Sequence, residues 1–312
     1  MGISTIDLHI HTNCSDGDYS PRDLIKYASK HGMKIISITD HDTITAYESN
    51  IIEYAKKFDI ILIPGIEFST VDEVSGQKIH VVGLNIDINN SDLKSLCNKI
   101  NISRREAVLS IKDKLSKIGI ELRSDKLFRS KSVVTKSHIG KDVITNPNNE
   151  KILKEIYNEI PLQGTFIEDY LIINKLAYVD KNDKLLVSEA IAMIKQSGGK
   201  SFCAHPSSSV MQGFDFKQMK KLIIRNKFDG VEAINIQYNK SDNDKRFDMV
   251  KEFLEFTKDN NLLISGGSDF HSENQQLWGK MSSLGLKNEK YHITQDIVDK
   301  IIYFDTSTKP IV

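Results

Sequence analysis

The strongest constraint on the fold is an alternation of apolar strands with amphipathic helices at both ends of the chain. Seven stretches have the length and apolar character of strands: 3–11, 33–40, 60–70, 78–87, 200–206, 228–236 and 261–271. Helical patterns lie between or after them, at 20–32, 43–58, 188–199, 216–226, 243–260 and 292–302. The alternation predicts βα units with parallel strand pairing. The 312 residues suffice for one barrel-sized domain or for a domain with an insertion.

The middle of the chain interrupts this alternation. Residues 91–122 form one long amphipathic helical pattern, and polar segments rich in lysine and asparagine, without clear strands, follow it. We therefore expect a helical insertion that acts as a cap or lid. The predicted organisation is a first barrel part at 1–90, the insertion at 91–178 and a second barrel part at 179–312.

Composition limits the classes of partner. The 42 basic side chains balance 42 acidic ones, so the chain lacks the basic field that binding along duplex nucleic acid requires. No stretch reaches the roughly 18 apolar residues of a membrane span, and the N-terminus lacks the pattern of a signal peptide. Three scattered cysteines do not form a disulfide framework. We expect a cytoplasmic protein with reduced thiols and no membrane partner, and its oligomeric state stays open.

Ionisable side chains gather at the ends of the predicted strands. In a β-strand alternate residues share one face, so Asp7, His9 and His11 are expected to point together. In an α/β barrel the loops after the strands meet at one face, where we expect such side chains to converge. Nine imidazoles and carboxylates occupy positions of this kind: His9, His11, Asp16, His41, Glu67, His80, His205, Asp269 and His271.

These nine residues have the chemistry of a metal cluster. Imidazole and carboxylate ligands together suit manganese, zinc or iron. Six neutral histidines and three carboxylates carry a charge of −3, so two divalent ions leave +1 and three leave +3. Either excess attracts a phosphate dianion, although the protein as a whole is neutral. We therefore predict two to three divalent ions and hydrolysis of a phosphate ester by hydroxide that the ions activate.

The motifs that carry these residues resemble a known family. In chain order they read "DLHIHTNCSDG", "ITDHDT", "GIEFS", "HVVGL", "CAHP" and "GSDFH". This series resembles the PHP (polymerase and histidinol phosphatase) superfamily, and it covers roughly residues 1–90 and 180–275. The resemblance implies an α/β fold, a distorted (β/α)7 TIM-like barrel, with a site for up to three metal ions.

The resemblance also implies a division of the ligands among the ions. The first ion would be held by His9, His11, Glu67 and Asp269. The second would be held by Asp16, His41 and His271. Glu67 would bridge the first ion and the third, and His80 and His205 would complete the third.

Within the superfamily, the chain is similar to bacterial nucleoside 3′,5′-bisphosphate phosphatases and to 5′→3′ exoribonucleases of short RNA. Those proteins carry an arginine-containing helix and an Arg-Pro-His segment at the phosphate pocket. Here "ISRREAVLSIKDKLSKIGIEL" offers Arg104 and Arg105, whereas "TKSHIGKDV" keeps His138 but has Lys136-Ser137 in place of Arg-Pro. The resemblance implies substrate contacts by these two arginines, Lys136 and His138, with His138 also a candidate acid for the leaving oxygen. A lysine supplies charge without the bidentate fork of arginine.

The expected substrate is a small phosphorylated molecule, in particular a nucleoside 3′,5′-bisphosphate or the 5′ end of a short oligonucleotide. Two alternatives within the same chemistry are histidinol phosphate and a cyclic ribose phosphate. A third alternative, from another class, is a non-catalytic module that metal ions stabilise, as happens when such domains become parts of polymerases. Hydrolysis of p-nitrophenyl phosphate on addition of manganese would separate an enzyme from such a module.

Overall fold

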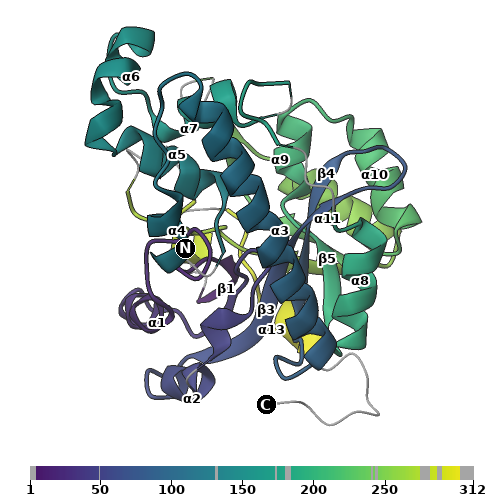
Figure 1. The fold of residues 1–312 in the computed structure, drawn as a ribbon. Coiled ribbons are helices and arrows are strands. Elements are labelled where there is room, and N and C mark those ends of the chain that lie inside the picture. Colours follow the sequence, from purple (N-terminus) through teal and green to yellow (C-terminus); the bar gives the residue numbers. More distant parts are fainter. Residues whose placement is uncertain are drawn as a thin grey trace.

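The fold is described from a computed structural model. It describes residues 5–48, 50–130, 133–172, 174–179, 184–239, 242, 245–274, 282–286 and 290–302. A curled sheet of seven strands carries helices around it (Figure 1). In sheet order the strands are β1 (Ile6–Ile10), β2 (Ile35–Ile38), β3 (Ile61–Val71), β4 (Lys78–Leu84), β5 (Lys200–Cys203), β6 (Gly230–Ile234) and β9 (Leu263–Gly266). A separate pair consists of β7 (Gln237–Asn239) and β8 (Lys245–Phe247).

The predicted parallel pairing is found among the strands on either side of β4, but β4 itself is antiparallel to its neighbours. β1, β2 and β3 are parallel to one another, as are β5, β6 and β9. β4 is antiparallel to both β3 and β5, so the expectation of parallel pairing throughout is wrong. The reason is the short connection 72–77, which forms a hairpin turn and leaves no room for a crossover helix.

The two edges of the sheet meet at the ends of their strands. Beyond β9, Phe270 forms a parallel bridge with Ile10 of β1. The backbone N–H of Asp269 donates to the carbonyl of His9 at 2.9 Å, and that of His11 donates to the carbonyl of Phe270 at 2.9 Å. The sheet therefore closes where the first and last site motifs lie, as expected of a distorted barrel.

Helices surround the sheet, but α9 (Pro206–Met211) was not predicted, and three predicted helices differ in extent from the observed ones. In chain order they are α1 (Pro21–Lys30), α2 (Ile51–Lys56), α3 (Ser91–Ser116), α4 (Ser124–Ser130), α5 (Lys136–Ile144), α6 (Glu150–Tyr157), α7 (Gln163–Tyr170), α8 (Val187–Gln196), α9 (Pro206–Met211), α10 (Phe216–Arg225), α11 (Val250–Asp259) and α13 (Gln295–Ile302). Ser20 caps α1, because its Oγ accepts from the N–H of Asp23 at 3.2 Å.

The predicted helix 43–58 is wrong in extent. It comprises a 3-10 turn at Thr45–Tyr47 and the short α2, and Asn50 before α2 has left-handed backbone with φ 57°. The predicted helix 243–260 also begins later than expected. Lys245–Phe247 pairs with β7, and α11 starts at Val250, whose N–H donates to Asp248 Oδ1 at 3.1 Å.

Two apolar clusters fill the two faces of the sheet. Neighbouring residues of one strand enter different clusters, for example Ile35 and Ile36 in β2 or Val81 and Val82 in β4. This alternation is what period-two strands covered on both faces require. The larger cluster includes buried residues of α1, α2, α8, α10 and α11, whereas the smaller one includes α13.

A third apolar cluster belongs to the helices in the middle of the chain. α3 joins it to the rest, since Leu93 packs in the larger barrel cluster and Leu115 in the third cluster. Figure 1 shows α3 running from beside the sheet toward α5, α6 and α7. Described residues between 91 and 179 form no strand, in line with a helical insertion, and its exact bounds stay a prediction. In the described part of the chain, no helix is both long and apolar enough to cross a lipid bilayer.

Candidate metal centre

The nine side chains singled out in the sequence lie close together, but Glu67 and His80 lie inside β3 and β4 and not at strand ends as expected. They come from β1, β3 and β4 and from the segments that follow β1, β2, β5 and β9. Ligand atoms within each of four groups lie within 4.8 Å of one another. The groups are His11, Asp16, His41 and His271; His9, Glu67 and His205; His9, His11 and Asp269; and His41, Glu67 and His80. These groups overlap, and the division of residues among individual ions stays a prediction.

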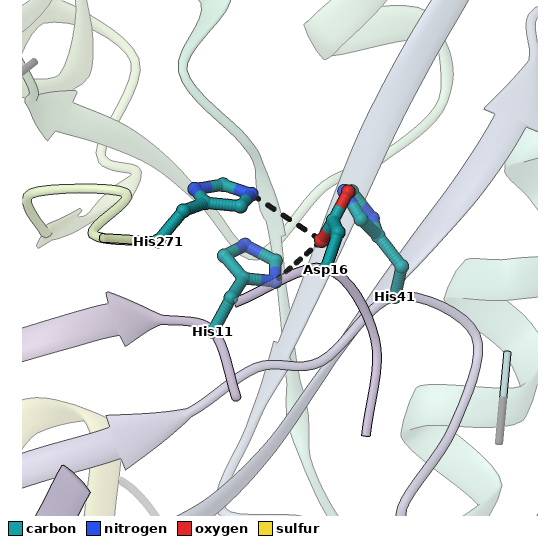
Figure 2. Close-up of side chains that lie close together, drawn as sticks. All are labelled: His11, Asp16, His41 and His271. Carbon is teal, nitrogen blue, oxygen red and sulfur yellow. Dashed lines mark ion pairs between the residues drawn. The ribbon is translucent and has the colours of Figure 1, made fainter. Parts of the chain in front are cut away.

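One carboxylate organises the group that Figure 2 shows. The imidazoles of His11, His41 and His271 surround Asp16, which lies in the loop after β1 (Figure 2). Oδ1 of Asp16 is 3.4 Å from His271 Nε2, 3.8 Å from His11 Nδ1 and 3.9 Å from His41 Nε2. Asp40 holds this loop in place, because it accepts hydrogen bonds from Thr12 N–H at 2.8 Å and from Thr12 Oγ1.

A second carboxylate, Glu67 of β3, lies fully buried among five imidazoles. Its place is fixed by backbone pairing, since Glu67 N–H donates to the carbonyl of Asp40 and its own carbonyl accepts from Asp42 N–H. Oε1 and Oε2 lie between 2.9 and 3.3 Å from ring nitrogens of His9, His11, His41, His80 and His205.

Buried acids and imidazoles shift one another's protonation. Burial alone would raise the pKa of Glu67, but His41, His9 and His80 hold that pKa well below its usual range. Burial likewise opposes ionisation of Asp16, yet His41 and His271 hold its pKa well below the ordinary value. The pKa of His9 is raised well above the ordinary value, because Glu232, Glu67 and Asp269 outweigh the effect of burial. The acids of this cluster therefore stay ionised and attract cations.

The donor set fits divalent metal ions. Asp16 Oδ1, Glu67 Oε2 and Asp269 Oδ1 are buried and have no hydrogen-bond partner among the described residues. His9 Nε2 lies only 3.1 Å from His11 Nε2. Leaving buried acceptors without partners is costly, and a cation bound between them removes that cost. Carboxylate oxygens and imidazole nitrogens are the ligands that zinc, manganese and iron share.

Two candidate ligands have strained backbone. His205 has φ 26° and Asp269 has φ 54°. Residues other than glycine rarely adopt positive φ angles. Strain of this kind costs about 1–3 kcal/mol per residue and persists where the surrounding structure enforces it. With this backbone conformation, His205 after β5 and Asp269 after β9 both place their side chains in the cluster. Sequence patterns could not reveal this feature.

Two buried acids near the cluster, Asp7 and Glu232, are not members of the four groups. Asp7 was expected to point with His9 and His11, but it is outside the four groups. It accepts from Ser268 N–H at 3.0 Å, from Ser268 Oγ and from Gly285 N–H at 2.8 Å, and so anchors the segment before Asp269.

Glu232 of β6 was missed by the sequence analysis. It is 2% exposed, and its Oε2 lies 2.8 Å from His9 Nδ1. A carboxylate in the middle of the apolar stretch "FDGVEAINI" was the available signal, because a buried acid requires partners.

A cavity of about 310 Å³ adjoins the cluster. Its lining contains three candidate ligands, together with cationic and aromatic side chains: Asp16, His41, His80, Lys78, Arg104, Lys136, Tyr178 and Lys184. Nζ of Lys78 is 4.9 Å and Nζ of Lys136 is 5.7 Å from the centre of the Tyr178 ring. Burial, Lys78 and Arg104 lower the pKa of Lys136 to about 8. Within the described part of the chain, no carboxylate forms an ion pair with Lys136.

The other predicted substrate contacts differ in position. Arg104 lines the cavity, and it forms a buried ion pair with Asp42. Arg105 does not line the cavity; it donates to the carbonyl of Phe128 at 3.3 Å and lies over that ring. His138 is buried and also outside the lining, and its Nδ1 accepts from Thr135 N–H at 3.0 Å. A role in substrate binding stays a prediction for all of these residues.

Comparison with known proteins identifies the family. The model of the PHP domain matches residues 7–238, which is more than half of the chain. The chain belongs to the PHP family. The resemblance seen in the motifs is thereby confirmed.

Several relatives align with most of this chain and with most of their own length. A 5′-3′ exoribonuclease of Haemophilus influenzae is 32% identical over 85% of this chain and 89% of its own. A phosphoribosyl 1,2-cyclic phosphate 1,2-diphosphodiesterase of Eggerthella lenta is 23% identical over 90% and 98%. A 3′,5′-nucleoside bisphosphate phosphatase of Chromobacterium violaceum is 24% identical over 86% and 88%. All three relatives hydrolyse phosphate esters, and this PHP protein is a metal-dependent phosphoesterase.

A solved structure supports the fold. A protein from Bifidobacterium adolescentis, to which metal-dependent phosphoesterase activity is ascribed, superposes with a TM-score of 0.74. It is 21% identical and covers 95% of both chains. The predicted PHP barrel fold is therefore confirmed.

Proposed function

We propose that this PHP protein hydrolyses a phosphate monoester of a small nucleotide. The substrate class is a nucleoside 3′,5′-bisphosphate or the 5′ end of a short oligonucleotide. The Haemophilus exoribonuclease and the Chromobacterium bisphosphate phosphatase, which align over most of this chain, support this class.

The observation that carries the proposal is the cavity that joins the acid and imidazole cluster to a set of cations. The chain has no net charge, yet Lys78, Lys136 and Lys184 share this cavity with Asp16 and His80. Lys136 is half-buried beside Lys78 and Arg104, and a cation in such a place is unfavourable unless an anion joins it. A substrate with a phosphate at the cluster and a second phosphate near the lysines supplies such an anion.

In this proposal the nine clustered side chains hold two to three divalent ions. When bound there, such ions supply Lewis acidity and activate water. The chain's own residues orient the reaction. Glu67 and Asp16 orient the imidazoles of the cluster, and Lys136 positions the second anionic group. His138 stays a candidate acid for the leaving oxygen.

The identity of the ions is part of the same proposal. Manganese, zinc and iron are all compatible with these ligands, because selection among them follows availability as well as geometry. Elemental analysis of protein purified without added metal measures which ion is retained and how many are bound per chain.

A substrate panel tests the proposed class. With Mn²⁺ present, we expect adenosine 3′,5′-bisphosphate or a short 5′-phosphorylated RNA to give a kcat/KM at least tenfold above that of histidinol phosphate. Lys136→Ala should lower this preference, whereas Lys151→Ala, at an exposed position on α6, should leave it unchanged. A kcat/KM for histidinol phosphate equal to that for the nucleotides would contradict the nucleotide assignment.

One relative supports a second candidate. The Eggerthella enzyme acts on a cyclic ribose phosphate and aligns over 90% of this chain. Phosphoribosyl 1,2-cyclic phosphate therefore belongs in the panel, and a higher kcat/KM for it than for every linear nucleotide would favour this second candidate.

A further inference from the structure

We propose that Glu232 is a positioning residue that determines which ring nitrogen of His9 faces the metal centre. The proposal rests on the metal centre of the proposed function. Glu232 is no member of the four groups, and it lies on β6 behind His9. Both side chains are almost fully buried, at 1% exposure each.

Three hydrogen-bond donors converge on the two oxygens of Glu232. Oε2 lies 2.8 Å from His9 Nδ1 and accepts from the backbone N–H of His205 at 3.2 Å. Oε1 accepts from Asn235 Nδ2 at 2.9 Å. One acid thus contacts the ring of one candidate ligand and the backbone of another.

The orientation of Asn235 is fixed independently. Its Oδ1 accepts from Gln237 Nε2, and its Nδ2 donates to the carbonyl of Gly267 at 3.0 Å as well as to Glu232. Turning this amide over would break the bonds to Gln237 and Gly267. Oε1 of Glu232 therefore accepts from Asn235, and Oε2, which accepts from the N–H of His205, is the oxygen that faces Nδ1 of His9.

The consequence falls on His9. Because Oε2 accepts, Nδ1 of His9 carries the hydrogen, and the lone pair of a neutral ring lies on Nε2. That nitrogen is 3.3 Å from Glu67 Oε2, 3.5 Å from Asp269 Oδ1 and 3.1 Å from His11 Nε2. Carboxylates that fix metal-binding histidines in this manner commonly change metal affinity 10–100-fold when they are replaced.

A glutamine at this position cannot reproduce the pattern. Its NH2 group must oppose either Asn235 Nδ2 or the N–H of His205 and His9. In the second orientation, Nδ1 of His9 must accept a hydrogen bond from the glutamine NH2 group. The neutral ring then carries its hydrogen on Nε2, where it prevents this nitrogen from binding a metal ion. Glu232→Gln keeps the size of the side chain and changes only its hydrogen bonding.

The test measures Mn²⁺ affinity of the full chain by competition with a chelator. We expect Glu232→Gln to raise the apparent Kd of at least one ion tenfold or more. Asp229→Asn is the matched control: Asp229 precedes β6 and accepts from Ser201 N–H at 2.9 Å, away from the histidines. It should lower the thermal midpoint and leave Mn²⁺ affinity within twofold of wild type.

A second measurement needs no variant. In the Zn²⁺-loaded wild-type protein, nitrogen NMR of the histidine rings should find the His9 hydrogen on Nδ1. A hydrogen on Nε2, unchanged Mn²⁺ affinity in Glu232→Gln, or equal weakening in Asp229→Asn would overturn the positioning role. Wild-type protein that binds no Mn²⁺ would instead contradict the metal centre itself, and Glu232 would then have no ligand to position.

Discussion

Glu67 lies where five imidazoles meet, so this one buried carboxylate neutralises more candidate ligands than a single ion pair would. Its two oxygens serve different neighbours, with Oε1 near His80 and His205 and Oε2 near His9. Removing its charge leaves these imidazoles without a counter-charge and removes one ligand from two of the four groups.

Glu67→Gln is therefore expected to lower bound metal by at least one ion per chain and kcat by at least about 100-fold. Elemental analysis and turnover of adenosine 3′,5′-bisphosphate measure both effects. The control is Asp142→Asn, which removes a buried acid that pairs with Arg123 in the helical region. Full metal content in Glu67→Gln would contradict the role assigned to this residue.

If Lys136 binds the substrate as proposed, we expect it to make the activity depend on pH. Because burial and two neighbouring cations lower its pKa to about 8, the free enzyme loses this charge as the pH rises through 8. We expect kcat/KM for the bisphosphate to fall above that pH. Lys136→Arg keeps its charge, so this variant should retain activity to higher pH, with Lys151→Arg as the control. An identical alkaline decline in wild type and Lys136→Arg would rule out Lys136 as its source.

At the scale of elements, the end of β9 packs directly against β1. A Cβ at Gly267 would lie 2.4 Å from His9 Cβ and 2.6 Å from His9 N, which are rigid parts of the site. The glycine is thus required by the close approach of two chain segments that carry candidate ligands. The sequence "SGGSDFH" places this glycine two residues before Asp269.

Gly267→Ala should displace His9, lower the thermal midpoint by an amount equivalent to about 1–3 kcal/mol, and weaken Mn²⁺ binding. Gly164→Ala is the matched control, since a Cβ there meets nothing within 4 Å inside α7 and should stabilise the protein by up to about 1 kcal/mol. Calorimetry and metal titration of both variants measure these effects. Unchanged Mn²⁺ affinity in Gly267→Ala would contradict the close-packing interpretation.

The turn between β3 and β4 is tied to the end of α10 by Asp72. Both of its oxygens are 2.7 Å from Arg225 Nη2, and Oδ1 accepts from Asn226 at 2.8 Å. Although burial opposes ionisation, hydrogen bonds from Ser75, Asn226 and Arg225 lower the pKa of Asp72 from 3.8 to about 2. Because the folded pKa is the lower one, this acid stabilises the fold above pH 4, and the stabilisation is lost as the pH falls toward 2.

Asp72→Asn should therefore reduce the free energy of unfolding by about 2 kcal/mol at pH 7, and the difference should shrink between pH 4 and pH 2. Urea denaturation across this range measures it. Asp113→Asn, at an exposed position on α3, is the control. A difference that stays constant down to pH 2 would show that the charge of Asp72 contributes nothing.

At the scale of the whole molecule, the sequence predicted individual strands and helices, because their formation depends on residues close together in the chain. The strand that carries His9 and the capped helix at Ser20 follow from period-two alternation and from capping chemistry. Convergence of the six candidate ligands that follow β1, β2, β5 and β9 agrees with the rule that loops after barrel strands share a face, whereas His9, Glu67 and His80 lie within strands.

The features that sequence reasoning missed depend on contacts between distant segments. Glu232 of β6 contacts His9 of β1 only in the folded chain. The antiparallel β4 is an exception, because the short connection at 72–77 that decides it is local. The sequence analysis treated Arg104 as a substrate contact and gave no sign of its ion pair with Asp42, which is 62 residues away in the chain. Periodicity carries no information on such pairs.

The account's central claim is that acids and imidazoles from both ends of the chain bind divalent ions that make phosphate hydrolysis possible. The most direct measurement is metal content and turnover of adenosine 3′,5′-bisphosphate in wild type and in His9→Ala/His11→Ala, before and after chelation and addition of Mn²⁺. We predict two to three ions per wild-type chain, loss of activity on chelation, recovery with Mn²⁺, and neither full metal content nor recovery in the double variant. Undiminished metal content and turnover in the double variant would contradict the claim.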